Sequence, residues 1–103
     1  MEEAVRSNNG IVIRLTDERW AHITEEHSEL AGMRFDVLET LALPEQIYKG
    51  DGGELFAVRE VETGKYLVVI YREIGIDGFI ITAFSTRRFK SLEKRELLWS
   101  AQK

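Results

Sequence analysis

The sequence predicts an α+β domain in which N-terminal helices pack on a roughly four-stranded antiparallel sheet, a meander, with a C-terminal helix. Two observations carry this prediction. Residues 54–61, 65–73 and 79–87 are rich in β-branched and aromatic residues, and the links between them are too short for anything but antiparallel neighbours. Ahead of them, residues 33–43 place apolar side chains three and four positions apart, as one face of a helix requires.

The first residues predict a tail and then a strand. Residues 1–10 contain no apolar stretch, so we expect a flexible N-terminal tail followed by a single domain over residues 11–103. Residues 10–15 form a short apolar run bounded by glycine and predict the first strand.

Two helices are expected next. Thr16 is a good N-cap for a helix from Asp17 to His27, whose acidic first turn complements the helix dipole. Gly32 separates this helix from the second one, which Pro44 ends.

The C-terminal half predicts turns, strands and a last helix. A strand begins at residues 45–50, and "GDGG" at 50–53 is a flexible turn. Thr63-Gly64 and residues 75–78 predict the tight links of the meander. Residues 91–100 predict a terminal helix capped by Ser91.

Composition limits the classes of function. The chain has 103 residues, no cysteine and a net charge of −4, which excludes thiolate metal sites and argues against a broad surface that coats nucleic acid. No apolar run approaches the ~18 residues of a membrane span, so we expect a cytoplasmic protein without membrane contact. Residues 87–95 nevertheless hold five basic residues and one acid. This run fits either a phosphate-binding patch or the solvated face of a helix.

Charged and hydroxyl side chains interrupt one face of the predicted sheet. A two-residue hairpin loop at Thr63-Gly64 places Arg59 opposite Val68. The next hairpin then pairs Arg72 with Ile80 and Ile70 with Thr82. Arg59, Arg72 and Thr82 thus share a face. A guanidinium among apolar neighbours needs an anion, which is either a bound phosphate or a carboxylate of the protein, such as a helix-borne Glu for Arg59.

Both histidines of the chain lie in the first predicted helix. His27 falls on the packed stripe with Trp20 and Ile23, whereas His22 projects nearly opposite Trp20. Their spacing of five residues does not let them share a metal ion, and we expect no metal and no cofactor. His27 is either a hydrogen-bonded core residue or a general acid–base.

An ordered set of segments resembles a known family. The segments are "LTDERWAHITEEHSEL", "VLETLALPEQI", "YLVVIYRE", "GFIITAFSTRR" and "KRELLWS". Over residues 15–99 they resemble a small phage and bacterial domain of the barnase–EndoU–colicin–RelE-like nuclease superfamily. His22, His27 and Thr82 match the family's pattern. Ser28 departs from it, because the family often has proline there.

The resemblance implies a metal-independent endoribonuclease of toxin or RNA-processing type, with RNA as substrate and a protein inhibitor or antitoxin as a further partner. In this mechanism His27 is base or acid and His22 a spare proton carrier. Arg59 and Arg72, which come from the shared sheet face and not from the family's pattern, hold the phosphate, and Thr82 donates to a non-bridging oxygen. The alternative is a non-catalytic protein- or nucleic-acid-binding module of the same fold, which predicts that the arginines pair with the protein's own acids.

Overall fold

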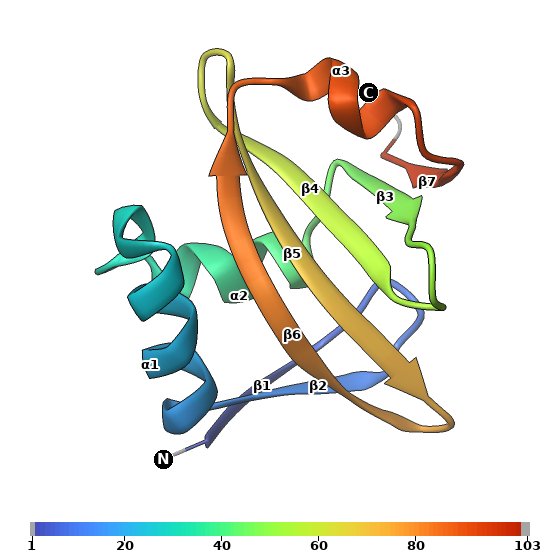
Figure 1. The fold of residues 1–103 in the computed structure, drawn as a ribbon. Helices are drawn as coiled ribbons and strands as arrows, with labels where there is room; N and C mark the ends of the chain where they lie inside the picture. The colour runs from blue at the N-terminus through green and yellow to red at the C-terminus, as the bar shows by residue number, and fades with distance from the viewer. Residues whose placement is uncertain (1, 102–103) are drawn as a thin grey trace.

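The centre of the molecule is a long, curved hairpin of β5 (Lys65–Ile74) and β6 (Asp77–Thr86). The computed structural model describes residues 2–101, which form seven strands in the order β1-β2-β6-β5-β4-β3-β7 (Figure 1). All neighbouring strands are antiparallel except β2 and β6, which are parallel. The remaining strands are β1 (Glu2–Arg6), β2 (Val12–Thr16), β3 (Gln46–Lys49), β4 (Leu55–Glu62) and β7 (Leu97–Ser100).

The first two helices form close to where the sequence predicts them. α1 spans Asp17–Glu26, and the hydroxyl of Thr16 accepts a hydrogen bond from the backbone N–H of Arg19 at 3.0 Å, which confirms the predicted N-cap. A single 3-10 turn, Ser28–Leu30, then leads to α2 (Arg34–Ala42). No helix among residues 2–101 is long and apolar enough to cross a membrane.

The prediction of a four-stranded antiparallel meander is wrong: the sheet is mixed and has seven strands. Glu2–Arg6, predicted as part of a flexible tail, forms β1, because it pairs with β2 and its Val5 packs against the core. β2 in turn lies parallel to β6, so the N-terminal segment extends the meander at one edge.

The C-terminal helix predicted over residues 91–100 is also wrong. α3 covers only Phe89–Glu93, and the chain then forms β7, which pairs with the outer edge of β3. Leu92 and Trp99 fit one helical stripe, but an extended chain lets residues 97–100 fill the hydrogen bonds of a free strand edge.

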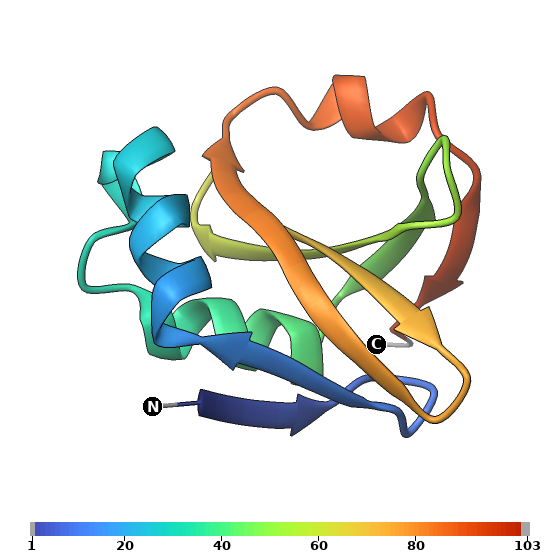
Figure 2. The same cartoon turned by 60° about the horizontal axis from the view of Figure 1, so that its bottom comes forward.

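The sheet buries apolar side chains on both faces. We call the two faces the α2-side face and the α3-side face, after the helix that packs on each; Figure 2 shows the two helices on opposite sides of the sheet. The main core lies on the α2-side face, where α1 and α2 contribute Ile23, Val37 and Leu41. A smaller core lies on the α3-side face and consists of Tyr48, Phe56, Val58, Val68 and Leu92.

A β-bulge changes the predicted register between β4 and β5. The predicted pairing of Arg59 with Val68 is wrong, because Arg59 lies opposite Leu67. The irregularity falls between Glu60 and Glu62, where one extra residue shifts every pair further along β4. Arg59 therefore shares the α2-side face with Leu67.

A second bulge lies between β5 and β6. Ile70 pairs with Thr82, as the sequence predicts, but Arg72 pairs with Phe79 instead of Ile80. The hairpin loop covers only residues 75 and 76, so Ile80 pairs with Tyr71 in the main core, and the extra residue on β6 then places Thr82 on the α3-side face. The bulge on β4 alone separates Arg59 from Arg72 and Thr82.

Tyr71 provides a test of the main core. Its side chain is fully buried, and its hydroxyl has no hydrogen-bond partner among the described residues. A buried hydroxyl without a partner costs free energy, so Tyr71→Phe is expected to leave the free energy of unfolding unchanged or to raise it by up to about 1 kcal/mol at pH 7. Urea unfolding of both proteins measures the difference, and a clear loss of stability in the variant would contradict the unpaired hydroxyl.

Tyr71 also predicts how the free energy of unfolding changes at alkaline pH. Burial raises the pKa of Tyr71, and the charge of Glu73 adds to the shift. Stability from this group is fully present below the ordinary tyrosine pKa of about 10 and falls as the pH rises further, because the unfolded chain ionises first. Tyr71→Phe should therefore lose less stability than the wild type between pH 9 and 11, and equal losses would contradict the prediction.

Candidate functional site

Three of the five predicted site residues belong to one side of the sheet. Thr82 and its neighbour Ile70 lie on the α3-side face, and Arg72 follows Ile70 by two positions on β5, so it points to the same face. His27 comes from the end of α1, where its ring centroid lies 6.2 Å from that of Phe84 on β6. The candidate site is therefore the α3-side face of β5 and β6, beside the end of α1.

His27 is held by the helix and open to solvent at its ring. Its backbone N–H donates to the carbonyl of Ile23 at 2.8 Å and so ends α1. Its side chain is 34% exposed, and Nδ1 lies 3.8 Å from a carboxylate oxygen of Glu29. A half-exposed imidazole that rests against an aromatic ring and has a carboxylate nearby is suited to proton transfer.

Thr82 presents an unused hydroxyl. Its Oγ1 is buried and has no hydrogen-bond partner within the described part of the chain. Buried polar atoms in native proteins usually have a partner, so an orphan hydroxyl on a candidate site face indicates a group that a ligand could complete. Here the hydroxyl is on the strand face that also bears Phe84.

Arg72 is one of the cations of this face, and its Nη1 lies at the loop before β4, 3.1 Å from the position that a Cβ on Gly53 would take. Among residues 2–101 no carboxylate lies within ion-pair distance of its guanidinium. The pKa of Glu54 is lowered, mainly because the backbone N–H groups of Glu54 and Gly52 donate hydrogen bonds to its carboxylate. The positive charge of Arg72 lowers this pKa to a smaller extent. Arg72 thus retains a charge that a bound anion could engage.

Arg59 lies on the other face and is neutralised. Its Nη1 donates to Oε1 of Glu39 at 2.7 Å, and its Nε donates to Oγ1 of Thr40 at 3.2 Å. Asp36 adds a carboxylate at 3.9 Å. The ion pair with a helix-borne glutamate, which the sequence left open against a phosphate, is the one observed, so Arg59 fixes α2 to the sheet.

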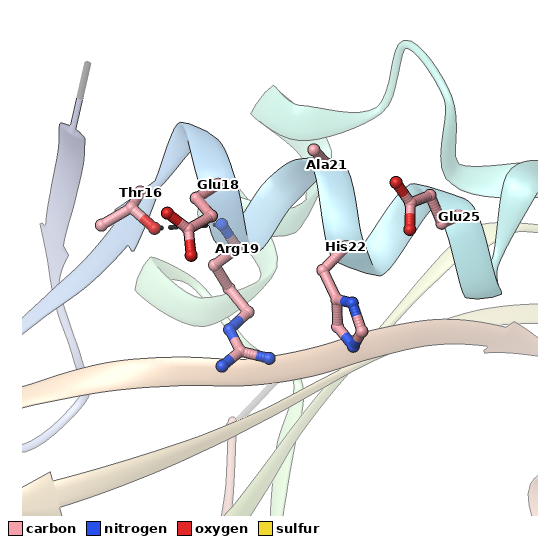
Figure 3. A pocket seen from close by; sticks show the side chains of 6 residues that line it. All are labelled: Thr16, Glu18, Arg19, Ala21, His22 and Glu25. Carbon is pink, nitrogen blue, oxygen red and sulfur yellow. Dashed lines mark hydrogen bonds between the residues drawn. The ribbon is translucent and has the colours of Figure 1, made fainter.

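His22 lies apart from the other candidates. Its side chain is 56% exposed and its Nε2 lies 3.2 Å from Oε1 of Glu26. It lines a hollow of about 440 Å³ on the outer side of α1, which also includes Arg19 (Figure 3). Glu18 and Glu25 line the same hollow and make it a poor place for a phosphate.

Three aromatic residues of the α3-side face, Tyr48, Tyr66 and Phe84, are of the type that can stack on an unpaired base. Tyr48 is buried at 4% exposure, and the ring of Tyr66 packs on Phe89 with a centroid distance of 4.7 Å. Tyr48 belongs to the small core under α3, and Tyr66 and Phe84 pack against it. Phe84 is half-buried and next to His27, which makes it the one of the three that adjoins the candidate site.

The sequence indicates a helix-borne glutamate as one of the possible partners of Arg59 but does not identify which one. Asp36 and Glu39 lie one turn apart on α2, so their carboxylates are on the same side of the helix. Both carboxylates face Arg59 and neutralise its charge. No group of three or more His, Asp or Glu side chains in residues 2–101 is placed to hold a metal ion.

Comparison with known proteins adds no relative: no family model, curated protein or solved structure matches the chain.

Proposed function

We propose that this domain cleaves single-stranded RNA by acid–base transfer to a cyclic phosphate, with the reacting phosphate on the α3-side face of β5 and β6. The observation that supports this proposal is the position of His27, a half-exposed imidazole packed against Phe84 on the face that carries Thr82 and Arg72. The resemblance to the nuclease superfamily, over residues 15–99, includes His27 and Thr82 but not Arg72, which is chosen for its place on this face.

In the proposed reaction His27 takes the proton of a ribose 2′-hydroxyl. The 2′ oxygen then attacks the adjacent phosphorus and the bond to the 5′ oxygen breaks, so the products are a 2′,3′-cyclic phosphate and a 5′-hydroxyl. The imidazolium returns its proton to the leaving 5′ oxygen. Arg72 balances the charge that develops on the phosphate, and Thr82 donates a hydrogen bond to a non-bridging oxygen. Arg59 has no part in it.

The partners and location follow from this reaction. RNA is the proposed substrate, and a protein inhibitor would act by covering His27 and Phe84. We place the activity in the cytoplasm, in keeping with a chain that has no cysteine.

The test is cleavage of an end-labelled single-stranded RNA of about 20 nucleotides in EDTA, with the products resolved on a gel. We expect fragments that end in a 2′,3′-cyclic phosphate, and no cleavage of the same sequence with 2′-O-methyl riboses, because these lack the attacking hydroxyl. Intact RNA after prolonged incubation with folded protein would overturn the proposal.

The second candidate function is a non-catalytic binding module. The neutralised Arg59 favours it, because one of the two arginines expected to seat a phosphate is tied to Glu39 and Asp36. This candidate predicts binding of the 2′-O-methyl RNA without cleavage of the unmodified one.

A further inference from the structure

The basic run of residues 87–95 folds around a hollow at the end of β6. β6 ends at Thr86, and α3 begins three residues later at Phe89. The hollow has a volume of about 500 Å³, in the range of small-ligand sites. We call it the basic hollow; its lining consists of Arg87, Arg88, Phe89, Lys90, Ser91 and Lys94.

The four cations of the basic hollow have no acidic partner in the part of the chain that the structure describes. All four side chains belong to exposed residues, and none lies within 4.0 Å of a carboxylate among residues 2–101. Arg95, the fifth basic residue of the run, differs: it pairs with Asp51 at 3.1 Å and lies over the ring of Phe56. Of the five basic residues of the run, Arg95 is thus neutralised by a carboxylate, and the four that surround the hollow have no such partner among residues 2–101.

The one acid of the run, Glu93, forms no ion pair with these cations among residues 2–101. Four like charges around one cavity repel each other, and an anion with several negative groups relieves this repulsion.

The backbone around the hollow is fixed in place. The hydroxyl of Thr86 accepts from the N–H of Arg88 at 3.0 Å, and the hydroxyl of Ser91 donates to the carbonyl of Arg88 at 2.8 Å. Leu92, 3% exposed, anchors α3 in the small core. The cations therefore project from a rigid base, which lowers the entropy cost of binding an anion.

We propose that the basic hollow binds successive phosphates of single-stranded RNA, next to the phosphate that lies at His27. This inference rests on the proposed function. Phe84 and Arg87 are three residues apart at the end of the same strand, so the hollow begins about 10 Å along β6 from the ring that packs on His27. A concave seat with an aromatic ring in its lining suits a flexible polyanion with bases better than a flat lipid surface.

The test measures binding of a fluorescent 12-nucleotide 2′-O-methyl oligouridylate, which cannot be cleaved, by fluorescence anisotropy at several salt concentrations. The variant carries Arg87→Gln, Arg88→Gln, Lys90→Gln and Lys94→Gln, all at exposed positions. A single variant, Lys90→Gln, is measured as well, and Lys49→Gln is its matched control. Lys49 is an exposed lysine that follows Tyr48 on β3 and so points to the α2-side face. Circular dichroism checks that each variant is folded.

For the wild type we expect log Kd to rise with log salt with a slope of about 3, since each phosphate contact on a single strand contributes about 0.7. The fourfold variant should bind roughly tenfold or more weakly and lose most of this slope. Lys90→Gln should weaken binding more than Lys49→Gln does.

Three results would overturn the inference: unchanged binding by the fourfold variant, equal losses in Lys90→Gln and Lys49→Gln, or binding to phosphatidylserine vesicles with none to the oligonucleotide. If the oligonucleotide binds through the hollow but the wild type leaves unmodified RNA intact, the proposed cleavage fails while the binding site stands.

Discussion

Replacing His27 by alanine is expected to lower the rate of RNA cleavage by about 100-fold or more, since a positioned general acid–base contributes roughly 10²–10⁴-fold. The imidazole lies against Phe84, beside the α3-side face of β5 and β6, and histidine is the side chain best suited to take and return a proton. Its loss should leave the fold intact, because the side chain is 34% exposed and α1 is ended by the backbone N–H of residue 27, which alanine retains. Initial rates with labelled RNA in EDTA measure the effect.

His22→Ala is the matched control, purified in the same way to reveal contaminating nuclease. It removes the only other histidine, which lies on the outer side of α1 and pairs with Glu26. We expect it to keep most of the activity. Equal rates for His27→Ala and the wild type would refute the role of His27, and a loss confined to His22→Ala would move the chemistry to the hollow on α1.

Gly78→Ala is expected to cause the largest loss of stability of any single methyl group added to this sheet, roughly 3 kcal/mol. Gly78 is buried in β6 and pairs with Glu73 on one side and Ile13 on the other. A Cβ there would overlap the carbonyl oxygen of Arg72 and lie 2.6 Å from Cδ1 of Ile13. The carbonyl belongs to the backbone of β5 and cannot turn away, so β2, β5 and β6 would have to separate.

Thermal unfolding measures this loss, and we expect the Tm of Gly78→Ala to fall by roughly 12 °C or more. Gly52→Ala serves as the control. A Cβ at Gly52 would meet only the side chain of Glu54, at an ordinary contact distance of 3.4 Å, so its Tm should change little. Equal Tm values for the two variants would contradict the close approach of the strands.

The local parts of the fold could be predicted from the sequence. The cap at Thr16, α2 and the hairpin loop at Thr63-Gly64 follow from residues that are neighbours in the chain. Their common feature is that the stabilising contact lies within one helical turn or one tight loop. Thr82 lies opposite Ile70 as predicted only because the extra residue on β6 offsets the second hairpin loop, which is shorter than predicted.

The remaining parts depend on contacts between distant residues. A polar segment such as Glu2–Arg6 becomes a strand because β2 offers it a free edge, which its own composition does not reveal. The bulges have a larger effect on the candidate site, because one extra residue on a strand moves the next side chain to the opposite face. Arg59 was assigned to the site with Arg72 for this reason, and the structure instead places it against Glu39 on α2.

The parallel pairing of β2 with β6 has a consequence for how fast the domain folds. Arg14 and Asp77, which bond across this pair, are 63 positions apart in the sequence. The β4–β5–β6 hairpins close short loops, whereas β2 docks only after a long stretch of chain has been restrained, which costs more entropy and slows folding. The rate-limiting barrier should therefore include the arrival of β2, and substitutions of Ile13 or Leu15 should alter the refolding rate as well as the unfolding rate.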